Sequence, residues 1–473
     1  MLHIPILRNG RPYESIDKVE IVHHATRQPV AQVSQANSGL VARDIRRMNA
    51  NVLESFTVTE LLAVCKKAGE LFMTATLPIG DEAHTFDDYL VHLSATTGMP
   101  VSYCRTNAEK VHRVFDQMDA IIAGLTRGID PAVLDRGYGQ HDGRMVSFAR
   151  SAKTFGAVLP SNSPGVHGLW MPAIALKTPI VLKPGREEPW TPYRIIEAFA
   201  AAGVPREAFG FYPTDHAGAG ELLRCVDRSM IFGGSATTDP YRADPTVEIH
   251  GPGLSKIVIG DDLIDDWPRF VDLMVTSIAA NGGRSCINAS GIWVPKHGDA
   301  IANALAERLA GIAALPADDP NARIAAFADP RVAHAMSDAI DHDLQREGAV
   351  DLTEQLRGTP RLVEKGNCAY ILPTIIRCED SQHPLANREF LFPYAAVVEC
   401  PSMDIPDAIG PSLVVSAITS DTALTHALMA SPNVDRLNIG AIPTVQLSWD
   451  QPHEGNLFEH LYHRRAFQIE PVA

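Results

Sequence analysis

From about residue 155 onward, short apolar strand patterns alternate with helix patterns, and this alternation constrains the fold more than any other feature. The strand patterns before residue 250 cover residues 155–159, 179–183, 209–212 and 229–232. The helix patterns between them cover residues 172–177, 192–202 and 217–224. Repeated βα units predict a parallel, doubly wound sheet, and ligands of such sheets bind beyond the carboxyl ends of the strands.

A second α/β unit follows, with strand patterns at 256–259 and 395–398 and a helix pattern at 300–309. The join near residue 250 is glycine-rich, as the hinge of a cleft would be. The sequence therefore predicts an α/β protein with two doubly wound parallel-sheet domains and a cleft between them. We expect the first domain at 1–249, with a helical part at about 52–130, the second at 250–430, and a returning segment at 431–473.

Composition excludes several classes of function. The chain has 473 residues and a formal net charge of −15 without a basic cluster, so nucleic acid is an unexpected partner. The most apolar stretch, residues 169–182, is broken by Pro172, Lys177 and Pro179, which argues against a membrane span. No signal-peptide pattern opens the chain. Seven scattered cysteines without a CxxC pair argue against a disulfide framework and a metal site, and they favour a reduced, cytoplasmic compartment.

One cysteine has a setting that suits catalysis. Cys286 lies in the glycine-containing segment 281–288, between a predicted helix at 267–280 and a predicted strand at 291–294. A thiol at such a junction is held by rigid elements and reachable from a cleft, with backbone amides nearby as donors to an oxyanion. The alternative is a buried packing cysteine. The other six cysteines lack this setting.

Further segments occur in a fixed order around Cys286. They are Pro160-Ser161-Asn162-Ser163-Pro164, Val181-Leu182-Lys183-Pro184, Phe232-Gly233-Gly234-Ser235, Glu389-Phe390-Leu391-Phe392-Pro393 and Leu437-Asn438-Ile439. With these segments the chain resembles the aldehyde dehydrogenase superfamily over roughly residues 150–470. The most specific signals are the VLKP segment followed by a helix and AGVP, and the N-x-G-x-x-C spacing that ends at Cys286.

The resemblance implies a role for each matching residue. Cys286 is the implied nucleophile, and Asn162 the side-chain donor that, with the Cys286 amide, holds the oxyanion. The implied cofactor contacts are Lys183 to the adenosine ribose, Gly234 and Ser235 to the pyrophosphate, and Glu389 to the nicotinamide ribose. In isolation each of these residues also has an ordinary structural reading, such as a turn asparagine or a solvated lysine.

The resemblance implies that Cys286 and NAD or NADP together oxidise an aldehyde to a thioester. Hydrolytic members release the acyl group with a glutamate base, but here Ile249 aligns with that position, and Glu248 and His250 flank it. The run Gly251-Pro252-Gly253 is more similar to the loop of coenzyme-A-acylating members. We therefore expect acylating release to coenzyme A, or the reverse reaction as an acyl-CoA reductase. Hydrolysis with Glu248 or His250 as base, and an inactive scaffold, are the alternatives.

Two further expectations complete the interpretation. Arg186 stands where an acidic residue often selects NAD, so an arginine there favours the extra phosphate of NADP, although Glu187 could still reach the ribose. The resemblance assigns residues 1–249 to the nicotinamide cofactor and 250–430 to the catalytic thiol. It also implies a small-molecule aldehyde substrate and a homo-oligomer, with 431–473 contributing to assembly.

Overall fold

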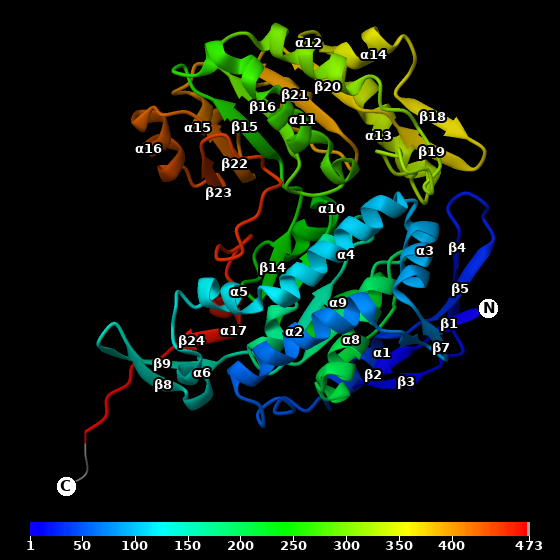
Figure 1. Ribbon diagram of the computed structural model, residues 1–473, viewed down its shortest axis with the longest axis vertical. Helices are drawn as coiled ribbons and strands as arrows, with labels where there is room; N and C mark the ends of the chain where they lie inside the picture. The colour runs from blue at the N-terminus through cyan, green and yellow to red at the C-terminus, as the bar shows by residue number, and fades with distance from the viewer. Residues whose placement is uncertain (471–473) are drawn as a thin grey trace.

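The computed structural model describes residues 1–470, which form two lobes, each built on a seven-stranded sheet (Figure 1). The sheet of the first lobe has the order β14-β13-β10-β11-β12-β2-β3. Strands β10 to β14 run parallel, and the hairpin β2-β3 adds two antiparallel strands at one edge. Its strands are β2 (Ile6–Arg8), β3 (Arg11–Tyr13), β10 (Phe155–Val158), β11 (Ile180–Lys183), β12 (Phe209–Phe211), β13 (Arg228–Phe232) and β14 (Val247–His250).

The sheet of the second lobe has the order β17-β20-β21-β16-β15-β22-β23. It is parallel from β20 to β23, and only β17 is antiparallel. Its strands are β15 (Ser255–Ile259), β16 (Ala289–Val294), β17 (Ala349–Asp351), β20 (Thr374–Cys378), β21 (Tyr394–Glu399), β22 (Ser412–Ile418) and β23 (Val434–Ile439). The predicted α/β class with parallel-sheet domains is therefore confirmed.

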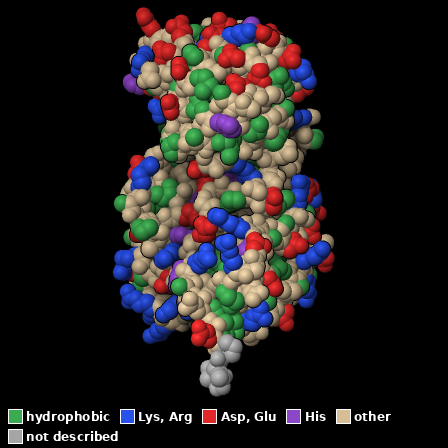
Figure 2. Space-filling view, turned by 90° about the vertical axis from the view of Figure 1, so that its left-hand side faces the viewer, with side chains coloured by type: hydrophobic (Ala, Val, Ile, Leu, Met, Phe, Trp, Pro, Cys, Tyr) green, Lys and Arg blue, Asp and Glu red, His purple; other side chains and the backbone are tan. Residues whose placement is uncertain are grey.

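The directions of the strands explain where the lobes meet. Strands β10, β11, β13 and β14 all run toward one edge of the first sheet, because they pair in parallel. The chain crosses from β14 to β15 within residues 251–254, so the carboxyl edge of the first sheet faces the amino edge of the second. Figure 2 shows the waist between the two lobes, with acidic, basic and histidine side chains gathered just below it.

Helices cover both sheets. Helices α2, α4 and α8 pack against one another over the first sheet, with Phe72, Phe115 and Phe199 buried between them. The first-lobe helices are α1 (Ser38–Ile45), α2 (Val58–Thr74), α3 (Phe86–Thr97), α4 (Val101–Asp116), α5 (Met118–Leu125), α6 (Pro131–Arg136), α7 (Pro172–Ala175), α8 (Trp190–Ala202), α9 (His216–Cys225), α10 (Ser235–Thr238) and α17 (Leu457–Leu461). Those of the second lobe are α11 (Val271–Ala279), α12 (Gly298–Leu309), α13 (Pro330–Asp343), α14 (Leu352–Arg357), α15 (Ile405–Ala408) and α16 (Thr422–Ala430).

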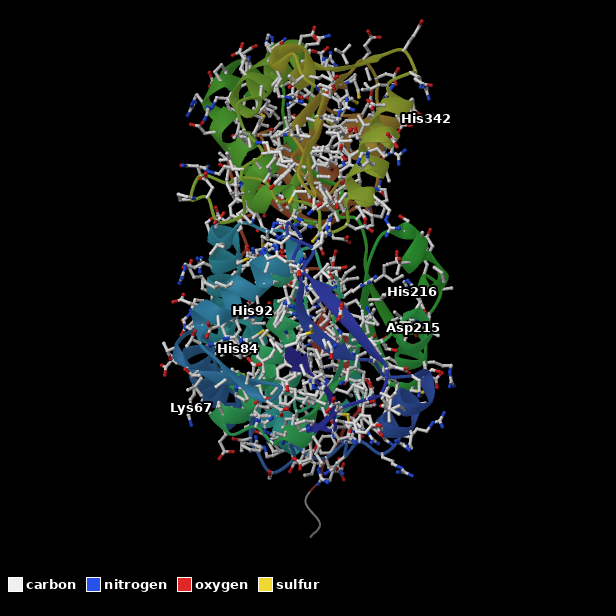
Figure 3. All side chains as sticks on the ribbon, turned by 90° about the vertical axis from the view of Figure 1, so that its right-hand side faces the viewer. Lys67, His84, His92, Asp215, His216 and His342 are labelled. Atoms are coloured by element: carbon white, nitrogen blue, oxygen red, sulfur yellow. The ribbon has the colours of Figure 1, made fainter. Side chains whose placement is uncertain are left out.

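Short strands complete the structure. They are β1 (Leu2–Ile4), β4 (Lys18–Val22), β5 (Pro29–Ser34), β6 (Leu77–Ile79), β7 (Glu82–His84), β8 (Tyr138–His141), β9 (Arg144–Arg150), β18 (Leu362–Lys365), β19 (Cys368–Ile371) and β24 (Tyr462–Arg464). Figure 3 shows the face where β4 and β5 lie, with His84 and His92 in the first lobe and His342 in the second.

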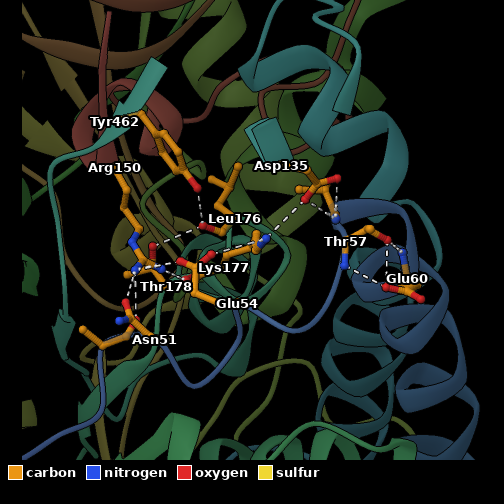
Figure 4. A network of polar contacts seen from close by, with 12 residues as sticks. Asn51, Glu54, Thr57, Glu60, Asp135, Arg150, Leu176, Lys177, Thr178 and Tyr462 are labelled. Carbon is orange, nitrogen blue, oxygen red and sulfur yellow. Dashed lines mark hydrogen bonds and ion pairs between the residues drawn. The ribbon is translucent and has the colours of Figure 1, made fainter. Parts of the chain in front are cut away.

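The C-terminal part of the chain returns from the second lobe to the first. After β23 it runs back past the waist, and β24 pairs with β9 (Figure 1). A polar network fixes this return (Figure 4). Tyr462 Oη donates to the Leu176 carbonyl at 2.9 Å, and the buried Lys177 ammonium lies 3.3 Å from Asp135 and 3.6 Å from Glu54. The segment 431–470 thus belongs to both lobes, and residues 471–473 of the expected third segment lie outside the described residues.

One helix differs from its expected bounds. The pattern predicted a helix at 267–280, whereas residues Ile264–Phe270 form a 3₁₀ turn and the α-helix begins at Val271. Pro268 has no N–H to donate and hinders a regular α-helical turn before it, so the apolar spacing alone placed the start too early.

Within residues 1–470, no helix has both the length and the apolar character needed to cross a membrane. The same residues hold no group of three or more His, Cys, Asp or Glu side chains placed to bind a metal ion.

Candidate active site

A cavity of ≈ 590 Å³ lies where the two sheets meet, and Cys286 lines it. Its wall combines the carboxyl edge of the first sheet, the loops before β15, β16 and β21, helix α4 and the returning segment 447–457. Of the predicted site residues, the cavity is lined by Cys286, Asn162, Glu248, His250, Gly234 and Glu389. Lys183, Arg186 and Ser235 do not line it.

The backbone around Cys286 is held from several sides. Ser255 Oγ donates to the Cys286 carbonyl at 2.8 Å, and Asn288 accepts from the Ser285 amide at 2.9 Å. The loop before β15 also comes very close, since a Cβ at Gly253 would lie 2.0 Å from the Cys286 carbonyl oxygen. Only glycine fits there. The loop is thus fixed in position, as a positioned nucleophile requires.

A network of polar side chains joins this loop to the first lobe. Asn281 has a left-handed backbone conformation (φ 53°), which asparagine tolerates better than most residues. Its side chain accepts from Asn107 Nδ2 at 2.7 Å and donates to Ser163 Oγ and Ser285 Oγ, each at 3.1 Å. Helix α4, the loop after β10 and the cysteine loop therefore share one hydrogen-bonded centre.

Asn162 lies against the cysteine loop, as the resemblance implied. Its Nδ2 donates to the Arg284 carbonyl at 2.9 Å, two residues before Cys286. An amide nitrogen has a second hydrogen, which is available to an oxygen in the cavity. The geometry is compatible with an oxyanion donor, and that role stays a prediction.

The surroundings of Cys286 keep its thiol protonated at rest. Burial raises its pKa to about 12, and the charge of Glu389 acts in the same direction. The Lys110 ammonium and the backbone amides of Cys286 and Ile287 act in the opposite direction, because each stabilises a thiolate. Formation of the thiolate therefore requires a change in these surroundings when ligands bind.

Glu248 and His250 both line the cavity, whereas Ile249 packs into the apolar cluster under the sheet. Alternate residues of a strand face opposite sides of the sheet, so Ile249 points away from the side that Glu248 and His250 share. His250 Nε2 lies 2.9 Å from a Glu248 carboxylate oxygen, at an angle too poor for a good hydrogen bond, and His250 Nδ1 contacts the Glu454 carboxylate. The imidazole also stacks on Phe232 at 4.5 Å between ring centroids. Glu454 was not identified from the sequence.

Glu389 is engaged with the backbone before β15. Its carboxylate accepts from the Leu254 amide at 2.6 Å, and burial raises its pKa to about 7. The buried Lys256 ammonium donates to the Leu254 carbonyl at 2.5 Å, and burial lowers its pKa to about 7. Leu254 itself has a left-handed conformation (φ 46°), so these contacts hold a strained residue in place.

The other residues assigned to the cofactor lie at the ends of parallel strands. Lys183 ends β11 half-buried, and among residues 1–470 its ammonium has no hydrogen-bond or ion-pair partner. Ser235 is exposed at the start of α10, and a Cβ at Gly234 would meet no atom within 4 Å, so this turn is open to a ligand. Arg186 is exposed nearby. Lys183 and this glycine turn therefore lie at the same carboxyl edge of the sheet, with strand β10 between β11 and β13.

Besides Arg284 of the cysteine loop, two basic residues of the cavity wall were not identified by the sequence analysis. Lys110 comes from α4, and Arg436 comes from β23. A signal for Lys110 exists, because Asn107, Lys110 and Val114 share one helix face by their spacing. No local pattern marks Arg436, since only the packing of β23 against the waist brings it to the cavity.

Comparisons with known proteins agree with this architecture. The family model described as "Aldehyde dehydrogenase family" matches residues 12–410. A Staphylococcus aureus (strain bovine RF122 / ET3-1) protein, named provisionally as an aldehyde dehydrogenase, is 23% identical over 413 residues, which are 84% of this chain and 81% of that protein. An NAD⁺ complex of an aldehyde dehydrogenase from Bacillus cereus has a TM-score of 0.76 at 14% identity, covering 98% of this chain and 96% of that chain. An NAD-dependent aldehyde dehydrogenase from Sinorhizobium meliloti has a TM-score of 0.79 at 16% identity, covering 100% and 96%.

Proposed function

This chain belongs to the aldehyde dehydrogenase family, whose members are NAD(P)-dependent oxidoreductases, and we propose that it transfers the acyl group from Cys286 to coenzyme A. The proposal rests on the contacts of the three residues at and beside the position of the expected base. Ile249 packs away from the cavity, and Glu248 and His250 are engaged with each other and with Glu454.

The reaction requires three steps at Cys286. The thiolate forms a bond to the aldehyde carbon, and the carbonyl oxygen takes the negative charge, which Asn162 and the Cys286 amide are placed to meet. A nicotinamide cofactor held at Lys183, Gly234 and Ser235 would supply the hydride acceptor, and loss of hydride from that carbon would leave a thioester on Cys286. The coenzyme A thiolate then adds to the thioester carbon, and Cys286 leaves as a thiolate.

Release by water would need a base with a free lone pair close to the thioester. His250 Nδ1 contacts the Glu454 carboxylate, and its Nε2 lies 2.9 Å from a Glu248 oxygen without a well-aligned hydrogen bond. Both ring nitrogens therefore lie next to carboxylate oxygens of the chain. Glu248 faces that same ring and contacts the returning segment, where a Cβ at Gly455 would lie 3.0 Å from its Oε2. This mutual engagement supports a thioester that survives until coenzyme A arrives.

Hydrolysis is the second candidate function, and one observation favours it. Glu248 and His250 line the same cavity as Cys286, so a shift of the segment 452–455 that frees Glu248 would supply a base. The product would then be a free carboxylate.

Turnover with and without coenzyme A tests the proposal. An aldehyde panel is incubated with NAD⁺ or NADP⁺, reduced cofactor is followed, and the products are identified by chromatography. We expect sustained turnover to an acyl-CoA only when coenzyme A is present. Sustained release of carboxylate without it, lost in Glu248→Gln or His250→Gln, would establish the hydrolytic candidate instead.

We also propose that NADP is accepted, because Lys183 and the exposed Arg186 follow β11 close together. Arg186→Glu should shift the ratio of kcat/KM values toward NAD. An unchanged ratio would remove Arg186 from the cofactor site.

The division at residues 249 and 430, a homo-oligomer that uses the C-terminal segment, and a cytoplasmic location remain proposals. The passage from β14 to β15 near residue 250 supports the first of these boundaries, although β23 extends the second sheet beyond residue 430. Sedimentation of the purified chain tests the oligomer, and fractionation of the cells tests the location.

A further inference from the structure

We propose that Lys110 and Arg436 bind an anionic group, a carboxylate or a phosphate, at the far end of the aldehyde substrate. The inference rests on the proposed function, since it names the substrate class of the same cavity. It depends on two cations of the cavity wall that the chain itself does not neutralise.

Lys110 presents its ammonium to the cavity from α4. The ammonium lies beside the loop that carries Asn162, because a Cβ at Gly165 would come 3.4 Å from Lys110 Nζ. The side chain is half-buried, and within residues 1–470 it makes no hydrogen bond and no ion pair. Long lysine side chains normally keep the ammonium in water or against a carboxylate, so this position suits a ligand that brings the negative charge.

Arg436 reaches the same cavity from β23 and is more deeply buried, with 9% of its surface exposed. Its one hydrogen bond runs from Nη2 to the Ser448 carbonyl at 3.3 Å, and no carboxylate of residues 1–470 lies within 4.0 Å. A guanidinium has five N–H donors in a planar fork that matches a carboxylate or a phosphate. Most of its donors are therefore left for a ligand.

Lys110 and Arg436 share the cavity wall with a buried histidine, His453. Burial lowers the pKa of His453 to about 3, and the charges of His250, Lys110 and Arg436 add to this effect. His453 lines the same cavity, and its buried Nδ1 has no hydrogen-bond partner among residues 1–470. A neutral imidazole with an unpartnered nitrogen in this wall leaves a further polar group for a ligand.

No carboxylate of residues 1–470 forms an ion pair with these cations within 4.0 Å. The charge of Asp450 acts on Arg436, but from beyond that distance. Glu248 and Glu454 are engaged with His250, and Glu389 accepts from the Leu254 amide near Lys256. Apolar side chains complete the wall near α4 and the returning segment, among them Val114, Leu169 and Trp449. Such a wall fits the methylene chain that would join an anionic end to the aldehyde at Cys286.

Matched aldehydes test the inference. The values of kcat/KM are compared for straight-chain ω-oxocarboxylates against n-alkanals of the same carbon number, and for glyceraldehyde phosphate against glyceraldehyde. The carboxylate and phosphate arms identify which anion is bound. We expect the wild-type chain to prefer one anionic class by about tenfold or more, as a charged hydrogen bond provides.

Lys110→Met and Arg436→Met should each reduce that preference by about tenfold, mainly through a higher KM for the anionic aldehyde. The readout is the ratio of kcat/KM for the anionic aldehyde to kcat/KM for the neutral one. This ratio is needed because the Lys110 charge also acts on Cys286 and would change the activity toward both aldehydes. Arg436→Lys keeps the charge and should retain part of the preference, which shows that the loss is not a folding defect. Arg113→Met is the matched control, since Arg113 is exposed on the same helix and does not line the cavity.

Three results would overturn the inference. The first is equal activity of the wild-type chain on anionic and neutral aldehydes. The second is an unchanged preference in both Met variants. The third is that the Met variants have a higher KM for coenzyme A and an unchanged KM for the anionic aldehyde. The proposed function fails separately, if no aldehyde of either class reduces NAD(P) with the wild-type chain.

Discussion

At the scale of single residues, opposing charges control the Cys286 thiol. Burial and Glu389 raise its pKa, whereas Lys110 and two backbone amides lower it. The balance leaves the thiol protonated at rest. The thiolate is therefore disfavoured in the structure without ligands.

Glu389→Gln tests this balance through the pH dependence of Cys286 alkylation. Above about pH 7 Glu389 is mainly ionised, so its removal takes away a negative charge that disfavours the thiolate. The midpoint of iodoacetamide labelling at Cys286, followed by peptide mass spectrometry, should therefore move to lower pH. Glutamine still accepts from the Leu254 amide, which keeps the backbone in place. A midpoint that stays constant or rises would contradict the assigned effect of Glu389.

Asn162 is predicted to act in the transition state. Loss of one oxyanion donor typically lowers turnover by about 10²–10³. Asn162→Ala and Asn162→Asp should both lose kcat by this order, because neither side chain donates a hydrogen bond. The dissociation constant for the cofactor, measured by fluorescence titration, should change little. Normal kcat with only a raised KM in Asn162→Asp would assign Asn162 to ground-state binding.

At the scale of elements, Asn281 couples three segments that are far apart in the chain. Its side chain bonds to α4, to the loop after β10 and to the cysteine loop, and its backbone is left-handed. Asn281→Ala removes the bonds and places a β-carbon in an unfavourable conformation. Asn281→Gly removes the same bonds without that second cost.

We expect the free energy of unfolding of Asn281→Ala to be about 2–3 kcal/mol below that of wild type. The decrease in Asn281→Gly should be about 1 kcal/mol smaller than that in Asn281→Ala. Thermal unfolding followed by calorimetry gives the order of the midpoints: wild type, then Gly, then Ala. An alanine variant as stable as wild type would show that the network does not hold the cysteine loop.

Much of the element pattern could be predicted from the sequence. Strands β10, β11, β12, β13, β15, β16 and β21 and the helix at 300–309 follow from short apolar runs, which are local features, whereas β20 and β22 of the second sheet were not identified. The start of α11 was predicted too early, because Pro268 prevents the α-helical hydrogen bonding that the apolar spacing alone suggested. Candidate residues such as Cys286 and Asn162 were identified from motifs at strand ends, where the structure brings them to one cavity.

At the scale of the whole molecule, the cavity arises from parts that no local pattern connects. His250 meets Glu454 across 204 positions, and Asn107 meets Asn281 across 174. Helix α4, which contributes Lys110, lies within residues 12–410 matched by the family model, whereas the sequence analysis expected the resemblance only from about residue 150. These contacts depend on how the lobes and the returning C-terminal segment pack, so the charges of the cavity wall could not be predicted from the sequence.

The central claim is that Cys286 carries the acyl group until coenzyme A removes it. Intact-protein mass spectrometry after mixing the chain with aldehyde and NAD(P)⁺, without coenzyme A, tests this most directly. The account predicts a mass increase equal to one acyl group per chain, located at Cys286, absent from Cys286→Ala and removed by coenzyme A. Cofactor reduction that continues without such an adduct, or that persists in Cys286→Ala, would contradict it.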